Sequence, residues 1–194
     1  MDVYDKNSMI RWHIKNMMKY LIRETVSSQS EASVVILKEY FMEFGDTRND
    51  WYLMSYFWES CWLSEWFGDQ QLAETLFKEC DPLRNFLHDH LFSISLSALR
   101  DHQEDAIMRL LQMILGFEMK HCYKMVIGAL LDYRLKQRDF RGCVEIMQNC
   151  IALKIKLTAV QDERFLNLLI ANGLKCPPTV IKTIYNNKTV PYKF

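Results

Sequence analysis

The chain has 194 residues, of which 49% are hydrophobic and 25% charged, and its 24 lysines and arginines balance 24 aspartates and glutamates. This composition excludes intrinsic disorder, which needs low hydrophobicity and high net charge, and six glycines are far too few for a collagen-like chain. A formal net charge of zero gives no general attraction to nucleic acid or to an acidic membrane, so binding to either needs a local patch.

Apolar residues recur with helical spacing along almost the whole chain, and no window alternates cleanly with period two. The sequence therefore predicts an all-α fold of about ten helices joined by short connections. The third helix carries apolar residues on nearly every side, which places it in the middle of the fold. The expected helices are 6–25, 31–44, 51–67, 70–80, 82–99, 104–116, 118–137, 140–153, 160–172 and 179–186.

Polar residues and glycines mark the expected helix ends. Side chains able to accept a hydrogen bond from a free backbone N–H precede four of the helices, at Ser30, Asp50, Asp101 and Asp139. Gly45 is expected to stop the second helix and Gly68 the third. Asp81 followed by Pro82 is a cap with proline at the first helical position, which opens the helix at 82–99.

Three helix starts superpose on a small residue, Ala73, Ala106 and Cys143, in steps of 33 and 37 residues. A period near 34 with two helices per unit is typical of stacked helical hairpins, and a small residue lets the two helix axes approach closely. We expect one helical-repeat domain over residues 1–174. Residues 175–194 are expected to hold a short helix and a basic tail with Lys175, Lys182, Lys188 and Lys193.

The stretch Gly128–Gln148 resembles a pentatricopeptide repeat, and Phe165-Leu166-Asn167 resembles the start of another. The resemblance covers about residues 57–170, and tetratricopeptide-type hairpins fit almost as well. It implies an α-solenoid of about five hairpins. Pentatricopeptide proteins read single-stranded RNA, one base per repeat. In the register of this chain the base-reading positions fall on Gly128 and Glu163, which depart from the usual Asn, Thr or Ser.

Residues that carry chemistry are sparse. The chain has no Cys-x-x-Cys or His-x-x-x-His pair, no glycine-rich phosphate loop and no nucleophile elbow, so we expect no metal, no cofactor and no catalysis. The six scattered cysteines are expected to be reduced core thiols. The acidic amino terminus is unlike a secretory signal and no apolar run is long enough to span a membrane, so an intracellular location, cytoplasmic or nuclear, is expected.

The tryptophans predict a surface for a protein partner or for self-association. Trp58, Trp62 and Trp66 recur every fourth residue on one helix face, and the alternative is that they fill the core. Trp and Tyr are enriched where interfaces hold their binding energy. The expected docking residues are Trp51, Tyr52, Trp58, Trp62 and Trp66.

A basic set supports the alternative function, RNA binding in RNA processing or regulation. Phosphate contacts would come from Lys120, Lys124, Arg134, Arg138 and Arg141, unless these residues form an ordinary solvated face. The sequence thus favours a non-catalytic helical-repeat module that scaffolds or docks a protein, with RNA as the second option.

Overall fold

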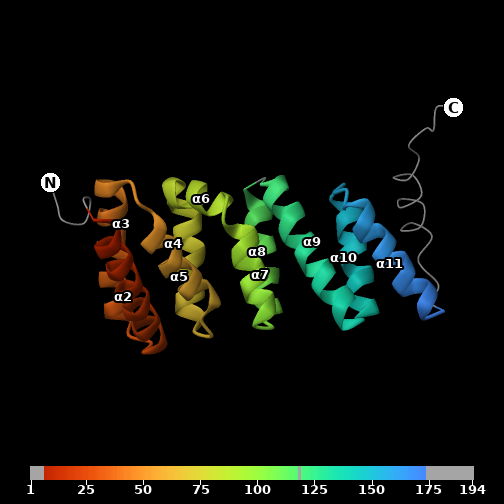
Figure 1. Cartoon of the computed structure of the whole chain (residues 1–194), viewed down its shortest axis with the longest axis horizontal. Coiled ribbons are helices and arrows are strands. Elements are labelled where there is room, and N and C mark those ends of the chain that lie inside the picture. The colour runs from red at the N-terminus through yellow and green to blue at the C-terminus, as the bar shows by residue number, and fades with distance from the viewer. Residues whose placement is uncertain (1–6, 118, 174–194) are drawn as a thin grey trace. The chain divides into compact units, whose positions relative to one another are not determined.

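The computed structural model of the chain describes residues 7–117 and 119–173, and every regular element in these ranges is an α-helix. Ten helices, α2 to α11, follow one another along this part of the chain (Figure 1). The all-α class expected from the sequence is confirmed. The helix expected at 179–186 and the lysines of the tail lie outside the described residues.

The chain divides into two compact units, residues 1–94 and residues 95–194. The division falls inside α7 (Leu91–Arg100). The domain expected over residues 1–174 therefore contains two units, and their behaviour as a single domain stays a prediction.

In the first unit the central helix is α4 (Tyr52–Leu63). It packs against α2 (Ser8–Ser27), α3 (Glu31–Arg48), α5 (Phe67–Glu79) and α6 (Asp81–His88). Seven of the twelve residues of α4 are buried, so the central position predicted from its apolar residues is confirmed.

In the second unit the central helix is α9 (Lys120–Gln137). It packs against α8 (Glu104–Gly116), α10 (Phe140–Ala152) and α11 (Ala159–Ala171). An unbroken buried run from Val126 to Leu131 shows that α9 is covered on all sides in its middle.

The small residues aligned from the sequence lie on the buried sides of three helices. Ala73 of α5, Ala106 of α8 and Cys143 of α10 are each at most 4% exposed. All five cysteines in the described ranges are also buried, as expected for core thiols. Burial raises the pKa of Cys143 to about 11 and that of Cys150 to about 12, so both thiols stay protonated at neutral pH.

The predicted caps have different outcomes, and Asp81 is not a cap, because α6 includes Asp81 and follows Cys80. Asp139 precedes α10, and its carboxylate accepts a hydrogen bond from the Gly142 N–H at 3.0 Å. That bond, together with the Arg134 guanidinium, lowers the pKa of the Asp139 carboxyl. Asp101 is not the cap of α8, because His102 adopts a left-handed conformation (φ 58°) and the helix starts only after Gln103.

Gly45 does not stop α3, which continues to Arg48 and ends at Asn49 with a left-handed φ of 50°. A Cβ at position 45 would lie 3.0 Å from ring atoms of Trp51. Gly45 therefore admits the Trp51 indole against the backbone of α3.

Gly68 does not end α4 either. The helix stops at Leu63, and Gly68 lies in the first turn of α5. The Ser64 hydroxyl donates to the Asp69 carboxylate and the Gln70 side-chain amide donates to the Ser64 carbonyl, both at 2.7 Å. These polar groups form the turn between α4 and α5.

The helix expected at 82–99 is interrupted. α6 ends at His88 and α7 begins at Leu91. A hydrogen bond joins His90 Nδ1 to the Phe86 carbonyl oxygen at 2.8 Å, and the His90 ring stacks on the Phe86 ring at 4.4 Å. This local bonding competes with continuation of the helix.

Candidate functional site

The tryptophan-rich region is mostly core. Trp58, Trp62 and Trp51 are 0%, 2% and 6% exposed. The Trp58 indole N–H donates to the Ala73 carbonyl at 2.9 Å, and its ring stacks on Trp62 with 5.5 Å between centroids. The expectation that these three rings form a docking surface is therefore wrong, and the core alternative holds for them.

The other two expected docking residues differ from each other. Trp66 is 43% exposed and precedes Phe67, which is 73% exposed. Tyr52 is half-buried, and its ring lies under the ammonium groups of Lys15 at 4.5 Å and Lys19 at 5.0 Å. Of the five, Trp66 alone is highly exposed, while Tyr52 belongs to the contact between α2 and α4.

That contact is an array of cations over tyrosines. Lys15, Lys19 and Arg23 follow one another every fourth residue along α2, and the Lys19 ammonium and the Arg23 guanidinium also lie over Tyr56, at 5.2 and 5.5 Å. Such contacts contribute about 0.5–2 kcal/mol each, depending on desolvation.

Carboxylates compensate most of the charge of this array. Lys15 forms an ion pair with Asp50 at 2.7 Å. Burial raises the pKa of Glu59, and the nearby Lys19 and Arg23 oppose that rise. The array holds α2 against α4 and offers little free charge to a polyanion.

The predicted basic set is divided between the two ends of α9. Lys120 and Lys124 are exposed near its amino end, and Arg138 is its left-handed carboxyl cap. At 1.5 Å per residue, Lys120 and Arg138 lie about 27 Å apart along the helix. The set therefore does not cluster at one place.

Arg134 is committed to neighbouring helices rather than to solvent. Its guanidinium pairs with Glu104 of α8 at 2.5 Å and with Asp139 before α10. Arg141 pairs with Glu145 one turn further along α10 at 3.2 Å. Arg134 thus joins three helices of the second unit, which is a structural role.

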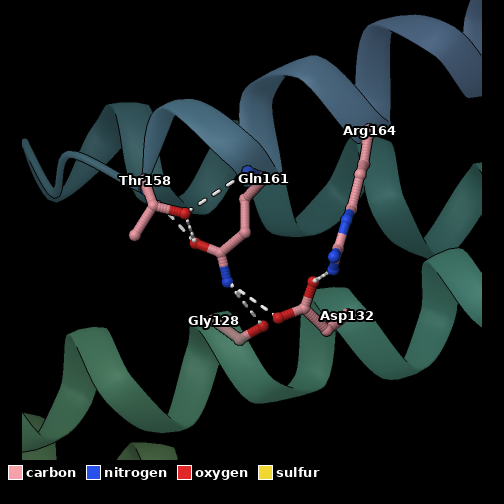
Figure 2. A network of polar contacts seen from close by, with 5 residues as sticks. All are labelled: Gly128, Asp132, Thr158, Gln161 and Arg164. Carbon is pink, nitrogen blue, oxygen red and sulfur yellow. Dashed lines mark hydrogen bonds and ion pairs between the residues drawn. The ribbon is translucent and has the colours of Figure 1, made fainter.

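A polar network joins α9 to α11 (Figure 2). Thr158 and Gln161 form a capping box at the start of α11. The Gln161 side-chain amide then donates to the Gly128 carbonyl and to the Asp132 carboxylate, both at 3.1 Å. Arg164 pairs with the other oxygen of Asp132 at 3.2 Å.

Gly128 makes this network possible. A Cβ at this position would lie 2.9 Å from Gln161 Nε2, closer than ordinary contact. Gly128, at the expected base-reading position, therefore lies against Gln161 of α11. Glu163, the corresponding residue in the following unit, is exposed. The sequence signal for the network was Thr-x-x-Gln at 158–161, a capping-box pattern that the sequence reasoning missed.

An apolar pocket of about 160 Å³ opens in the second unit between α8, α9 and the segment after α10. Ile114 is fully buried and Tyr123 is 7% exposed, whereas Leu115 and Leu153 are 50% and 39% exposed. The lining residues are Ile114, Leu115, Met119, Lys120, Tyr123, Leu153 and Ile155. The pocket thus has an apolar wall with one cationic side chain.

Within residues 7–117 and 119–173, no group of three or more His, Cys, Asp or Glu side chains is arranged to hold a metal ion. None of the helices in the described ranges is both long and apolar enough to cross a membrane. Comparison with models of protein families, with curated proteins and with solved structures finds no match to this chain.

Proposed function

We propose that the chain is a non-catalytic module of stacked helical hairpins that docks a protein partner. The contacts within each unit support the stacking. α9 packs against its neighbours α8 and α10 and also against α11, and α4 packs in the same way against α2 and α6. Contact between alternate helices is what neighbouring hairpins of an α-solenoid produce.

The observation that carries the docking proposal is the apolar pocket. A cavity of about 150 Å³ lined by aliphatic and aromatic side chains holds a benzene ring, so a pocket of this size accepts one large apolar side chain. Lys120 at the pocket favours a carboxylate beside that side chain. The proposed partner presents a Phe, Leu or Met next to an Asp or Glu.

Peptide selection tests the proposal. A displayed library of random peptides is panned on the 194-residue chain, and enriched peptides are then measured by fluorescence anisotropy. We expect enrichment of an apolar residue next to an acidic one. The Leu153→Asp variant should bind at least about tenfold more weakly, because a carboxylate in an apolar pocket is poorly solvated.

Val160→Asp is the matched control, since Val160 is 55% exposed in the same unit and does not line the pocket. It should bind the peptide like the unaltered chain. Failure to enrich any peptide, or equal losses in both variants, would contradict the proposal.

RNA binding has weaker support, because the basic residues are dispersed and Arg134 is paired twice. Anisotropy with a pool of random single-stranded RNA, at low and at physiological salt, separates the two proposals. Tight binding that weakens steeply with salt and is lost in Lys120→Ala and Lys124→Ala variants would favour RNA instead of protein.

A further inference from the structure

Exposed lysines border the apolar pocket of the second unit on two of its walls. Lys120 lines the pocket from the first turn of α9, and Lys124 lies one turn further along the same side of that helix. Lys154 and Lys156 flank Ile155, a lining residue in the segment after α10. All four lysines are exposed, and we call them the lysine rim.

The rim lies close enough to the pocket for its charge to act on a ligand there. Lys154 stands between Leu153 and Ile155, which both line the pocket, and neighbouring Cα atoms are about 3.8 Å apart. Lys124 lies about 6 Å from Lys120 along the helix axis, at 1.5 Å per residue. Screening at physiological ionic strength acts over about 8 Å. A ligand seated in the pocket is therefore within the field of both lysine pairs.

The charge of the rim is not compensated by the residues that the structure describes. None of their carboxylates forms an ion pair with a rim lysine, whereas Arg134 and Arg164 of the same unit are both paired. The stretches 114–124 and 153–157, which hold the rim, contain four lysines and one acidic residue, Glu118. Their net charge is thus +3, in a chain whose net charge is zero.

The pocket between the lysines favours a protein segment over RNA. Its wall is aliphatic except for Tyr123, and that residue is 7% exposed, so the pocket offers no exposed aromatic ring for stacking on a base. A base would also leave polar groups unpaired against the aliphatic wall. An apolar side chain fills the pocket without either disadvantage.

We propose that the partner segment carries acidic residues on both sides of its apolar anchor, one side meeting Lys120 and Lys124 and the other meeting Lys154 and Lys156. This inference rests on the proposed function and specifies its partner. An extended chain rises about 3.3 Å per residue, so acidic residues up to three positions from the anchor reach about 10 Å on each side. Complementary charge speeds the association and excludes basic segments.

Panning the displayed library of random peptides on rim variants tests the charge pattern. On the unaltered chain, Asp and Glu should be enriched on both sides of the apolar residue, within about three positions. Lys154→Gln/Lys156→Gln removes one pair of the rim, and Lys120→Gln/Lys124→Gln removes the other. On either variant, each enriched peptide should carry acidic residues on one side of the anchor only.

Affinities of the most enriched peptide, measured by fluorescence anisotropy, separate the rim from the pocket. Each rim variant should bind about three- to tenfold more weakly at low salt, the effect of losing two exposed ion pairs. At about 0.5 M salt, where the Debye length is about 4 Å, this difference should vanish, while the loss in Leu153→Asp should remain.

Lys136→Gln/Arg138→Gln is the matched control, because it removes two exposed charges at the other end of α9. It should bind the peptide like the unaltered chain. All the substituted lysines and arginines are exposed, so folding should be retained, and the helical circular dichroism of each variant verifies this.

The outcomes that overturn the inference differ from those that overturn the docking function. Enriched peptides with an apolar anchor but no acidic preference, or rim variants that bind as tightly as the control, overturn the role of the rim and leave the docking function standing. Failure to enrich any peptide overturns both. A peptide that binds equally well with serine in place of its anchor, or more weakly than random single-stranded RNA, also overturns both and makes the lysines a general polyanion surface.

Discussion

Replacing Trp58 with alanine should severely destabilise the first unit, whereas the same change at Trp66 should not. Trp58 is fully buried, stacks on Trp62 and donates to the Ala73 carbonyl. Removing the ring loses roughly 200 Å² of buried apolar surface. At 25 cal/mol per Å² this loss lowers the free energy of unfolding by about 5 kcal/mol. The lost hydrogen bond adds about 1 kcal/mol, and partial relaxation of the core reduces the total. We expect a loss of about 4–5 kcal/mol.

Trp66 is the matched control, because it is a tryptophan of the same unit, in the turn before α5, and is 43% exposed. Its replacement should cost about 1–2 kcal/mol, since only part of its ring is covered. Urea unfolding followed by circular dichroism gives both free energies of unfolding. Trp58→Phe, which keeps most of the apolar volume, provides a milder variant if the alanine variant does not fold.

The reasoning is refuted if the two alanine variants have free energies of unfolding within about 1 kcal/mol of each other, because a buried ring and a half-exposed ring then contribute equally. It is also refuted if Trp58→Phe is as destabilising as Trp58→Ala. That result would assign the whole effect to the indole N–H and none to the packing of the ring.

Three further predictions concern the second unit and the thiols. Asp139→Ala should cost about 1 kcal/mol at neutral pH, and urea titrations should show this difference shrinking as the pH falls through the lowered pKa of Asp139, where the unaltered carboxyl also becomes neutral. Arg138→Gly should raise the midpoint of thermal unfolding, because glycine removes a left-handed strain (φ 58°) of up to about 1 kcal/mol. Cys61, Cys143 and Cys150 should resist a disulfide reagent at pH 8 until urea unfolds the chain, because burial raises the pKa of each thiol; rapid labelling of the folded chain would contradict their burial.

The helices were predictable because apolar residues recur along each of them with the spacing of a helical turn. This pattern is visible in the local sequence and does not depend on residues far along the chain. Some helix ends were not. Gly45 lies inside α3 and leaves room for the Trp51 ring, and Gly128 leaves room for Gln161, 33 residues later in the chain. A glycine that serves a distant contact and a glycine that ends a helix look alike in sequence.

The candidate sites were predicted less well for a related reason. The spacing of Trp58 and Trp66 predicts a shared helix face, but α4 ends at Leu63 and Trp66 lies in the turn before α5, so the two rings belong to different elements. Apolar residues on every side of α4 were the better signal, because such a helix is covered all round. Sequence spacing placed Arg134 on a basic surface. Its two carboxylate partners, Glu104 and Asp139, come from other elements, and their proximity could not be seen from the spacing along one helix.

All five tryptophans, at positions 12, 51, 58, 62 and 66, lie in the first unit and none in the second. Tryptophan emission therefore follows the unfolding of residues 1–94 alone, whereas the helical circular dichroism follows both units. Coincident transitions by the two signals mean that the units unfold cooperatively as one domain. Separate transitions mean that each unit unfolds with its own stability. Because the tryptophans lie in one unit, the cooperativity between the two units can be measured without any added label.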